Sequence, residues 1–84
     1  MSYSVIIENR AQKEFFKLPP QYGAAVRQAI DALAVNPRPH GVKKLAGSKD
    51  GYRVRVGVYR ILYTIDDKRR LATIYRIRDR KDAY

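Results

Sequence analysis

The chain has 84 residues, one histidine, no cysteine and a formal net charge of +10. This length allows a single domain over residues 1–84, and the lack of cysteine excludes disulfides and thiolate metal sites. Positions 38–84 carry fourteen basic residues and five aspartates, whereas positions 1–37 carry four basic and three acidic residues. Such an uneven distribution of charge indicates a nucleic acid or an acidic protein as partner.

The first predicted element is a short strand at Tyr3–Ile7, which is rich in strand-forming side chains. No basic region followed by a long apolar run precedes it, and no stretch of the chain is long enough to span a membrane. We therefore expect a soluble, cytoplasmic protein.

Two helices are predicted next. Asn9 is a suitable cap for a helix over about 10–18, which ends at Pro19-Pro20 because a proline disfavours helical geometry in the residue before it. The second proline suits the first turn of a new helix, whose apolar residues recur at helical spacing to about Val35.

The rest of the chain predicts a basic loop over 38–50 and then three strands, at about Gly51–Val56, Tyr59–Ile65 and Leu71–Ile77. Gly57-Val58 fits a two-residue type II′ turn, so the strands pair as antiparallel neighbours. The predicted fold class is α+β, with the order β-α-α-β-β-β. The helical pair packs on one face of a mainly antiparallel sheet and leaves the other face open.

Arginines alternate with apolar residues along these strands. If the apolar residues face the core, the guanidinium groups share the opposite face of the sheet, and their geometry matches phosphate. The arginines concerned are Arg53, Arg55, Arg60, Arg76 and Arg78. Tyrosines occupy several of the intervening positions, and we interpret them as core residues rather than base-stacking platforms: Tyr52, Tyr59, Tyr63 and Tyr75.

Two other polar features have simpler explanations. His40 is expected to be an exposed loop residue, because no acidic partner is close to it in sequence. Asp66-Asp67, followed by three basic residues, is expected to form a solvated turn rather than a metal site. We expect neither a metal nor a cofactor.

The arginine face suggests cleavage of RNA by attack of the ribose 2′-hydroxyl on the adjacent phosphate. Arginines can hold that phosphate and neutralise its charge. They are poor proton carriers, because their pKa lies above about 12. A tyrosine among cations suits proton transfer better, and Tyr84 follows the last arginine strand.

The chain resembles the RelE/ParE superfamily of bacterial toxins over nearly its whole length. The most characteristic match is the run from Tyr52 to Tyr63, YRVRVGVYRILY, and it is joined by EFFKL at 14–18, KKLAG at 43–47 and RKDAY at 80–84. The resemblance implies a toxin that is neutralised by an acidic antitoxin. In the RelE branch the toxin enters the ribosomal A site and cuts mRNA without a metal, which inhibits translation.

The resemblance also implies site residues. Family catalytic positions fall on Arg53, Arg55, Arg60, Arg78 and Tyr84, with Arg60 and Arg78 stabilising the phosphate and the transition state. Well-known RelE toxins have lysines at the positions of Arg53 and Arg55, and one of these lysines is assigned a proton-transfer role that arginine does not readily fill. We expect further RNA contacts from Lys43, Lys44, Lys49, Arg76, Arg80 and Lys81.

Two other functions remain open from the sequence. The ParE branch shares the fold and poisons DNA gyrase, so a non-catalytic gyrase inhibitor is the main alternative. A plain RNA-binding module is the third possibility, and its weakness is the lack of exposed aromatic residues at the expected strand positions. The toxin alone is expected to be a monomer that forms a larger complex with its antitoxin.

Overall fold

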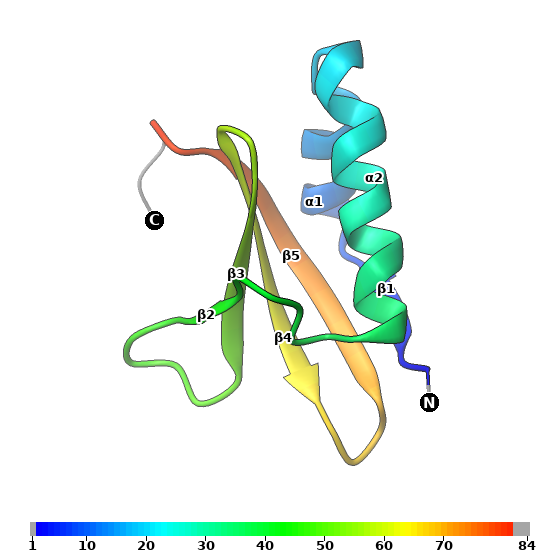
Figure 1. Cartoon of the computed structure of the whole chain (residues 1–84), viewed down its shortest axis with the longest axis vertical. Coiled ribbons are helices and arrows are strands. Elements are labelled where there is room, and N and C mark those ends of the chain that lie inside the picture. The colour runs from blue at the N-terminus through cyan, green and yellow to red at the C-terminus, as the bar shows by residue number, and fades with distance from the viewer. Residues whose placement is uncertain (1, 82–84) are drawn as a thin grey trace.

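The computed structural model describes residues 2–81 and has an α+β architecture, in which two helices pack on one side of a mixed sheet (Figure 1). The elements are β1 (Ser4–Ile7), α1 (Asn9–Phe16), α2 (Pro20–Val35), β2 (Lys43–Lys44), β3 (Gly51–Val56), β4 (Tyr59–Asp66) and β5 (Leu71–Asp79). The predicted fold class and the order of the longer elements are confirmed.

The strands form one sheet in the order β1-β5-β4-β3-β2. The strands β2, β3, β4 and β5 pair with one another in antiparallel fashion, and β1 lies parallel to β5, so the first and last of these strands are neighbours. The strand β2 was predicted as loop. Its two lysines pair with Arg53 and Tyr52 at the edge of β3, and a pairing this short leaves no periodic pattern in the sequence.

A proline begins the second helix, as predicted, whereas α1 ends at Phe16, two residues before the predicted end at residue 18. The helix α2 begins at Pro20, where a missing N–H costs nothing, and it buries Val26, Ile30 and Leu33 against the sheet. The helix α1 begins one residue earlier than predicted. Asn9 was expected to be its cap but is its first helical residue, and the cap position is held by Glu8 without a side-chain hydrogen bond.

Buried side chains from α2, β4 and β5 form the centre of the core between the helices and the sheet. Tyr63 is completely buried, and its hydroxyl donates a 2.7 Å hydrogen bond to the carbonyl of Pro37. Burial raises the pKa of the Tyr63 phenol well above its usual value. Tyr52 stacks beside it with ring centroids 6.1 Å apart, and these two tyrosines are core residues, as predicted.

The placement of Tyr75 corrects the prediction. The pairing between β4 and β5 shifts register by one residue, because Leu62 pairs with Arg76 whereas Tyr63 pairs with Ile74. Tyr75 is the extra residue of this β-bulge. It was expected to face the core, but it lines a hollow on the opposite face beside Leu62 and Arg78.

Glycines with positive φ form the tight turns. Gly57 has a φ of +60°, which fits the predicted type II′ turn between β3 and β4. Gly41 and Gly47, with φ of +89° and +77°, bend the basic loop. Over residues 2–81, the two helices are too short or too polar to cross a membrane.

A cluster of polar side chains ties the start of the chain to the turn between β4 and β5. Asp67 accepts two hydrogen bonds from the Arg38 guanidinium, at 3.1 and 2.9 Å, and one from the Tyr3 hydroxyl at 2.6 Å. These bonds lower the pKa of Asp67 to about 2. Asp67 lies in the turn, as predicted, whereas Asp66 is the last residue of β4. Asp67 also anchors Arg38 at the start of the basic loop.

Candidate functional site

The face of the sheet opposite the helices carries the candidate site. In antiparallel strands, residues that are directly paired point to the same face. Arg55 pairs with Arg60, and Arg60 pairs with Arg78, so three arginines form one row across β3, β4 and β5. Neighbouring strands lie about 5 Å apart, which brings the three side chains within reach of a single phosphodiester segment.

This arginine row (Arg55, Arg60 and Arg78) is an unusual arrangement for stability alone. Like charges directly opposite each other in a sheet disfavour folding. Arg55 is exposed, whereas Arg60 and Arg78 are half-buried and the Nε atom of Arg60 is inaccessible to water. A half-buried guanidinium has lost part of its hydration and therefore interacts strongly with an anion that approaches it.

A second row lies next to the first. Lys43 pairs with Arg53 across β2 and β3, and Arg53 pairs with Leu62, which pairs with Arg76. Lys43, Arg53 and Arg55 line a hollow of about 230 Å³ together with Gly41. Two arginines and a lysine around one hollow provide several donors to an anion of the size of a phosphate.

Arg76 belongs to this row by register, but its guanidinium is bound by a residue of α1. It binds the Glu14 carboxylate of α1, with Nη2 to Oε2 at 2.9 Å and Nε to Oε2 at 3.0 Å. The other carboxylate oxygen accepts the backbone N–H of Ile77 at 2.8 Å. An RNA contact by Arg76 stays a prediction, and its charge is already partly neutralised by Glu14.

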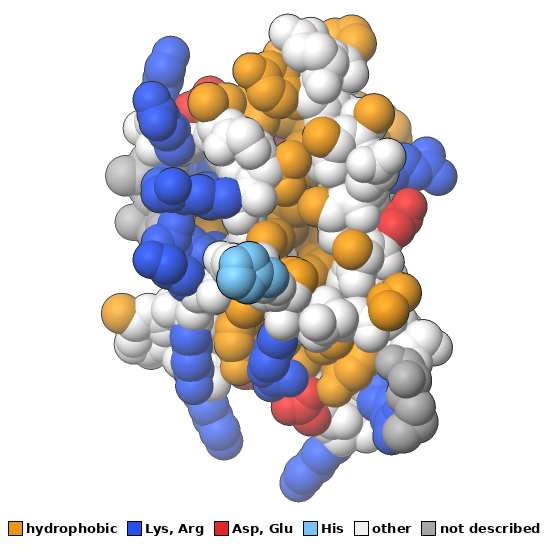
Figure 2. Space-filling view, in the orientation of Figure 1, with side chains coloured by type: hydrophobic (Ala, Val, Ile, Leu, Met, Phe, Trp, Pro, Cys, Tyr) orange, Lys and Arg blue, Asp and Glu red, His pale blue; other side chains and the backbone are white. Residues whose placement is uncertain are grey.

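The other residues predicted to contact RNA lie in the basic loop and after β5. Figure 2 shows Lys and Arg side chains gathered along the side of the molecule that lies over the sheet rather than over α2. Lys44, Lys49, Arg80 and Lys81 are exposed, and the backbone N–H of Arg80 donates to the Val58 carbonyl at 2.8 Å. Tyr84, the predicted proton-transfer residue, lies outside the described residues.

A second hollow on the same face, of about 560 Å³, was not expected from the sequence. Its walls are Leu62, Tyr75, Arg76 and Arg78 from the sheet and residues 45–48 from the basic loop. The loop is held over the sheet by hydrogen bonds from the Leu45 N–H to the Gly51 carbonyl and from the Gly51 N–H to Ser48 Oγ, both 2.9 Å. Among residues 2–81, no cluster of His, Cys, Asp or Glu has the composition of a metal site.

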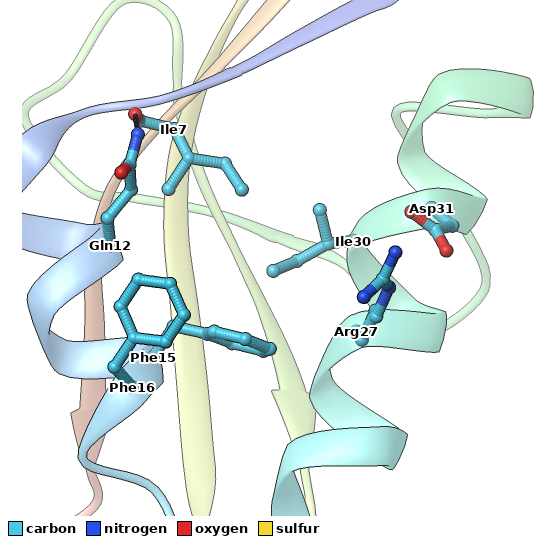
Figure 3. Close-up of a pocket in the computed structure, with 7 residues that line it drawn as sticks. All are labelled: Ile7, Gln12, Phe15, Phe16, Arg27, Ile30 and Asp31. Carbon is cyan, nitrogen blue, oxygen red and sulfur yellow. Dashed lines mark hydrogen bonds between the residues drawn. The ribbon is translucent and has the colours of Figure 1, made fainter.

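The helical side of the molecule carries a different kind of surface. Ile7, Phe15, Phe16 and Ile30 line a groove of about 300 Å³ between α1, α2 and β1 (Figure 3). Phe16 is 78% exposed, which is unusual for so large an apolar side chain. An exposed apolar groove of this kind is typical of protein–protein contacts.

Comparison with known proteins agrees with this architecture. Residues 5–84 match the family model described as the ParE toxin of the type II toxin–antitoxin system parDE. The chain is 34% identical over 87 aligned positions to a Methanocaldococcus jannaschii protein that carries the toxin name RelE1, covering 100% of this chain and 97% of that protein. It is 36% identical over 88 positions to the toxin RelG of Mycobacterium tuberculosis, covering 100% and 98%.

A solved structure gives the same result. The chain superimposes on a chain of the archaeal RelE–RelB complex from Pyrococcus horikoshii OT3 with a TM-score of 0.85 and 31% identity, covering 99% of this chain and 100% of that chain. The similarity therefore includes both the helices and the whole sheet.

Proposed function

The chain belongs to the ParE toxin family of type II toxin–antitoxin systems and is RelE-like in sequence and structure, and from this premise we propose that it is a ribosome-dependent, metal-independent mRNA endonuclease. Its substrate is mRNA in the ribosomal A site, in the cytoplasm. The observation that carries the proposal is the arginine row, in which three guanidinium groups lie opposite one another on the open face.

The reaction is an attack of the ribose 2′-oxygen on the adjacent phosphorus, with departure of the 5′-oxygen. Arg60 and Arg78 hold the non-bridging oxygens of the phosphate and stabilise the charge that grows on them. Arg53 and Arg55 contact the same strand from β3, beside the hollow that they share with Lys43. Holding the phosphate in line with the attacking oxygen contributes through orientation.

Proton transfer is assigned to Tyr84. The arginines remain protonated at neutral pH, so they neither accept the 2′ proton nor readily donate one to the leaving oxygen. A tyrosine close to several cations has a lowered pKa and can perform both steps. Lys43, Lys44, Lys49, Arg76, Arg80 and Lys81 provide the surrounding contacts to the RNA strand.

The proposal is tested by mapping mRNA 5′ ends in cells after induction of the protein. We expect new ends within translated codons. Replacing Arg60 with alanine should reduce their number about 100- to 1,000-fold, the usual effect of removing one group that stabilises transition-state charge. Arg10→Ala, an exposed arginine on α1, is the matched control and should cleave like the wild type. An unchanged transcriptome in the wild-type strain would contradict the proposal.

A second candidate function is inhibition of DNA gyrase, and the match to the ParE family model favours it. In that case the toxin stabilises double-strand breaks and does not cleave RNA. Purified protein should then inhibit supercoiling, and Tyr84→Phe should have no effect. Normal supercoiling at every soluble protein concentration would exclude this function.

The partner in either case is an acidic antitoxin, as supported by the RelE–RelB complexes among the structural neighbours. We propose that the antitoxin binds in two ways. An acidic segment covers the basic face, and an apolar segment fills the groove beside Phe16. Co-expression with the antitoxin should abolish toxicity.

A further inference from the structure

The hollow of about 560 Å³ beside Tyr75 lies on the open face of the sheet, and the proposed cleavage reaction assigns no role to it. It lies between the sheet and residues 45–48 of the basic loop, and Arg78 of the arginine row forms one of its walls. The hollow is therefore continuous with the arginine row.

The β-bulge places an aromatic ring in this hollow. Ile74 and Ile77 are both buried, so two residues, Tyr75 and Arg76, lie between successive core positions of β5 where regular alternation would allow one. The register shift turns Tyr75 toward Leu62 and Arg78. Partial burial, together with the nearby Asp50 carboxylate, raises the pKa of Tyr75, so the ring stays neutral at physiological pH.

The lining of the hollow has the chemistry of a site for a nucleobase. Leu45, Leu62 and the Tyr75 ring provide apolar and aromatic surface, and no acidic residue is among the described lining side chains. Ser48 Oγ accepts the Gly51 N–H, which leaves its own proton to donate to an acceptor on a base edge. Bases stack on aromatic rings with little sequence preference, because every base has a π face.

The position of the hollow relative to Arg78 fits a nucleotide. Tyr75 and Arg78 are three residues apart on β5, about 10 Å at ~3.3 Å per residue, and the long arginine side chain shortens this gap. A base in the hollow would therefore place its phosphate at the end of the arginine row. Arg76 also lines the hollow, but its charge is bound by Glu14, so the phosphate would lie on Arg78.

We propose that this hollow binds one unpaired nucleobase of the RNA strand, stacked on Tyr75, while the adjoining phosphate lies on the arginine row. The inference rests on the proposed RNA substrate and adds to it a base-binding subsite. The charge of the surrounding face favours RNA over an apolar segment of a protein partner as the occupant, because the arginines would have to be desolvated without an anion to pair with them.

The test is the binding of a short single-stranded RNA that carries 2′-O-methyl groups and therefore cannot be cleaved. Affinities of the purified toxin are measured by fluorescence anisotropy for this RNA and for versions with one abasic position at a time. One abasic position should weaken binding to the wild type about 5- to 100-fold, which corresponds to the loss of one base stacked on an aromatic ring.

Variants at Tyr75 complete the thermodynamic cycle. Tyr75→Phe should bind the RNA like the wild type. Tyr75→Leu keeps the apolar volume and hence the fold, but its RNA affinity should fall by the same factor as the abasic position causes in the wild type. The abasic position should then cause no further loss of affinity in Tyr75→Leu. Thr73→Ala, on the same face of β5 and outside the hollow, is the matched control. Unfolding curves verify that each variant is folded.

The outcomes separate this inference from the proposed function. If every abasic RNA binds the wild type equally, or if Tyr75→Leu retains full RNA affinity, the subsite is refuted even when mRNA is cleaved in cells. If Tyr75→Leu weakens only the antitoxin complex, the hollow is a protein contact and the inference is wrong. If the abasic effect is present and no mRNA is cleaved in cells, the subsite stands and the nuclease proposal fails.

Discussion

The carboxylate of Glu14 on α1 binds Arg76 on β5, 62 residues further along the chain. It also accepts the backbone N–H of Ile77 at 2.8 Å. The strand β1 pairs with β5 only as far as Ile74, so the following part of β5 would be an open edge. Glu14 satisfies a donor of that edge and at the same time fixes α1 on the sheet.

The first prediction concerns this contact. Glu14→Ala should lower the free energy of unfolding by about 2–3 kcal/mol, because it leaves a half-buried N–H and a half-buried guanidinium without their acceptor. Glu14→Gln keeps a neutral acceptor and should cost about half as much. Urea unfolding measures both. An alanine variant as stable as the wild type would show that the contact has no net energetic role.

The second prediction concerns the buried hydroxyl of Tyr63. Tyr63→Phe removes its hydrogen bond to Pro37 and should destabilise the protein by about 1 kcal/mol. The raised pKa of Tyr63 means that the neutral phenol is favoured in the folded state. The contribution of the neutral Tyr63 phenol to folding stability is therefore complete below about pH 10, the usual tyrosine pKa. This contribution is lost as the pH rises further. Stability measured against pH should fall less steeply above that value in the phenylalanine variant.

The third prediction concerns acid stability. The pKa of Asp67 is lowered to about 2 by Arg38 and Tyr3, from its ordinary value of 3.8. The carboxylate therefore stabilises the fold above pH 3.8, and this contribution is lost as the pH falls toward 2. Asp67→Asn should flatten the thermal stability profile in that range. Arg38→Gln should flatten it only in part, because Tyr3 still donates to Asp67, and the double variant should match Asp67→Asn.

The fourth prediction concerns the arginine row. Arg55→Gln should stabilise the free toxin by about 0.2–1 kcal/mol in low salt, because it removes a like charge opposite Arg60. The gain should shrink in high salt as the charges are screened. The same variant should cleave less mRNA. Thermal unfolding at two ionic strengths measures the first effect, and a salt-independent change would indicate a cause other than charge repulsion.

The fifth prediction concerns the apolar groove. Phe16 is 78% exposed, so Phe16→Ser should change the stability of the free toxin by less than about 0.5 kcal/mol. It should weaken binding of the antitoxin at least about tenfold, the effect of losing an aromatic anchor worth more than ~1.4 kcal/mol. Calorimetric titration measures this affinity. Gln28→Ser, exposed on α2 and outside the groove, is the control.

Local signals explain what the sequence predicted well. Pro19-Pro20 separates the helices, and Gly57 forms the turn between β3 and β4, because each residue acts on its own backbone. The alternation of arginine with valine along β3 correctly predicted that Arg53 and Arg55 lie on the open face, because alternation is also a local property of the strand backbone. These predictions needed no knowledge of distant contacts.

The features that were missed depend on tertiary structure. The β-bulge that moves Tyr75 to the open face comes from the register between two strands, and nothing in either strand marks it. The partners Arg38 and Asp67 are 29 residues apart, and Tyr3 and Asp67 are 64 apart. Glu14 was part of a family motif in the sequence, and only the packed fold shows that its carboxylate caps an edge of the sheet.

The place of β5 in the sheet also determines when the protein can fold. This strand lies between β1 and β4, although it is the last to be synthesised. The parallel pair with β1 and the row that ends at Arg78 therefore cannot form until residues 71–79 have left the ribosome that makes them. Such long-range pairing is slow to form. The arginine row is thus assembled only after β5 has been synthesised.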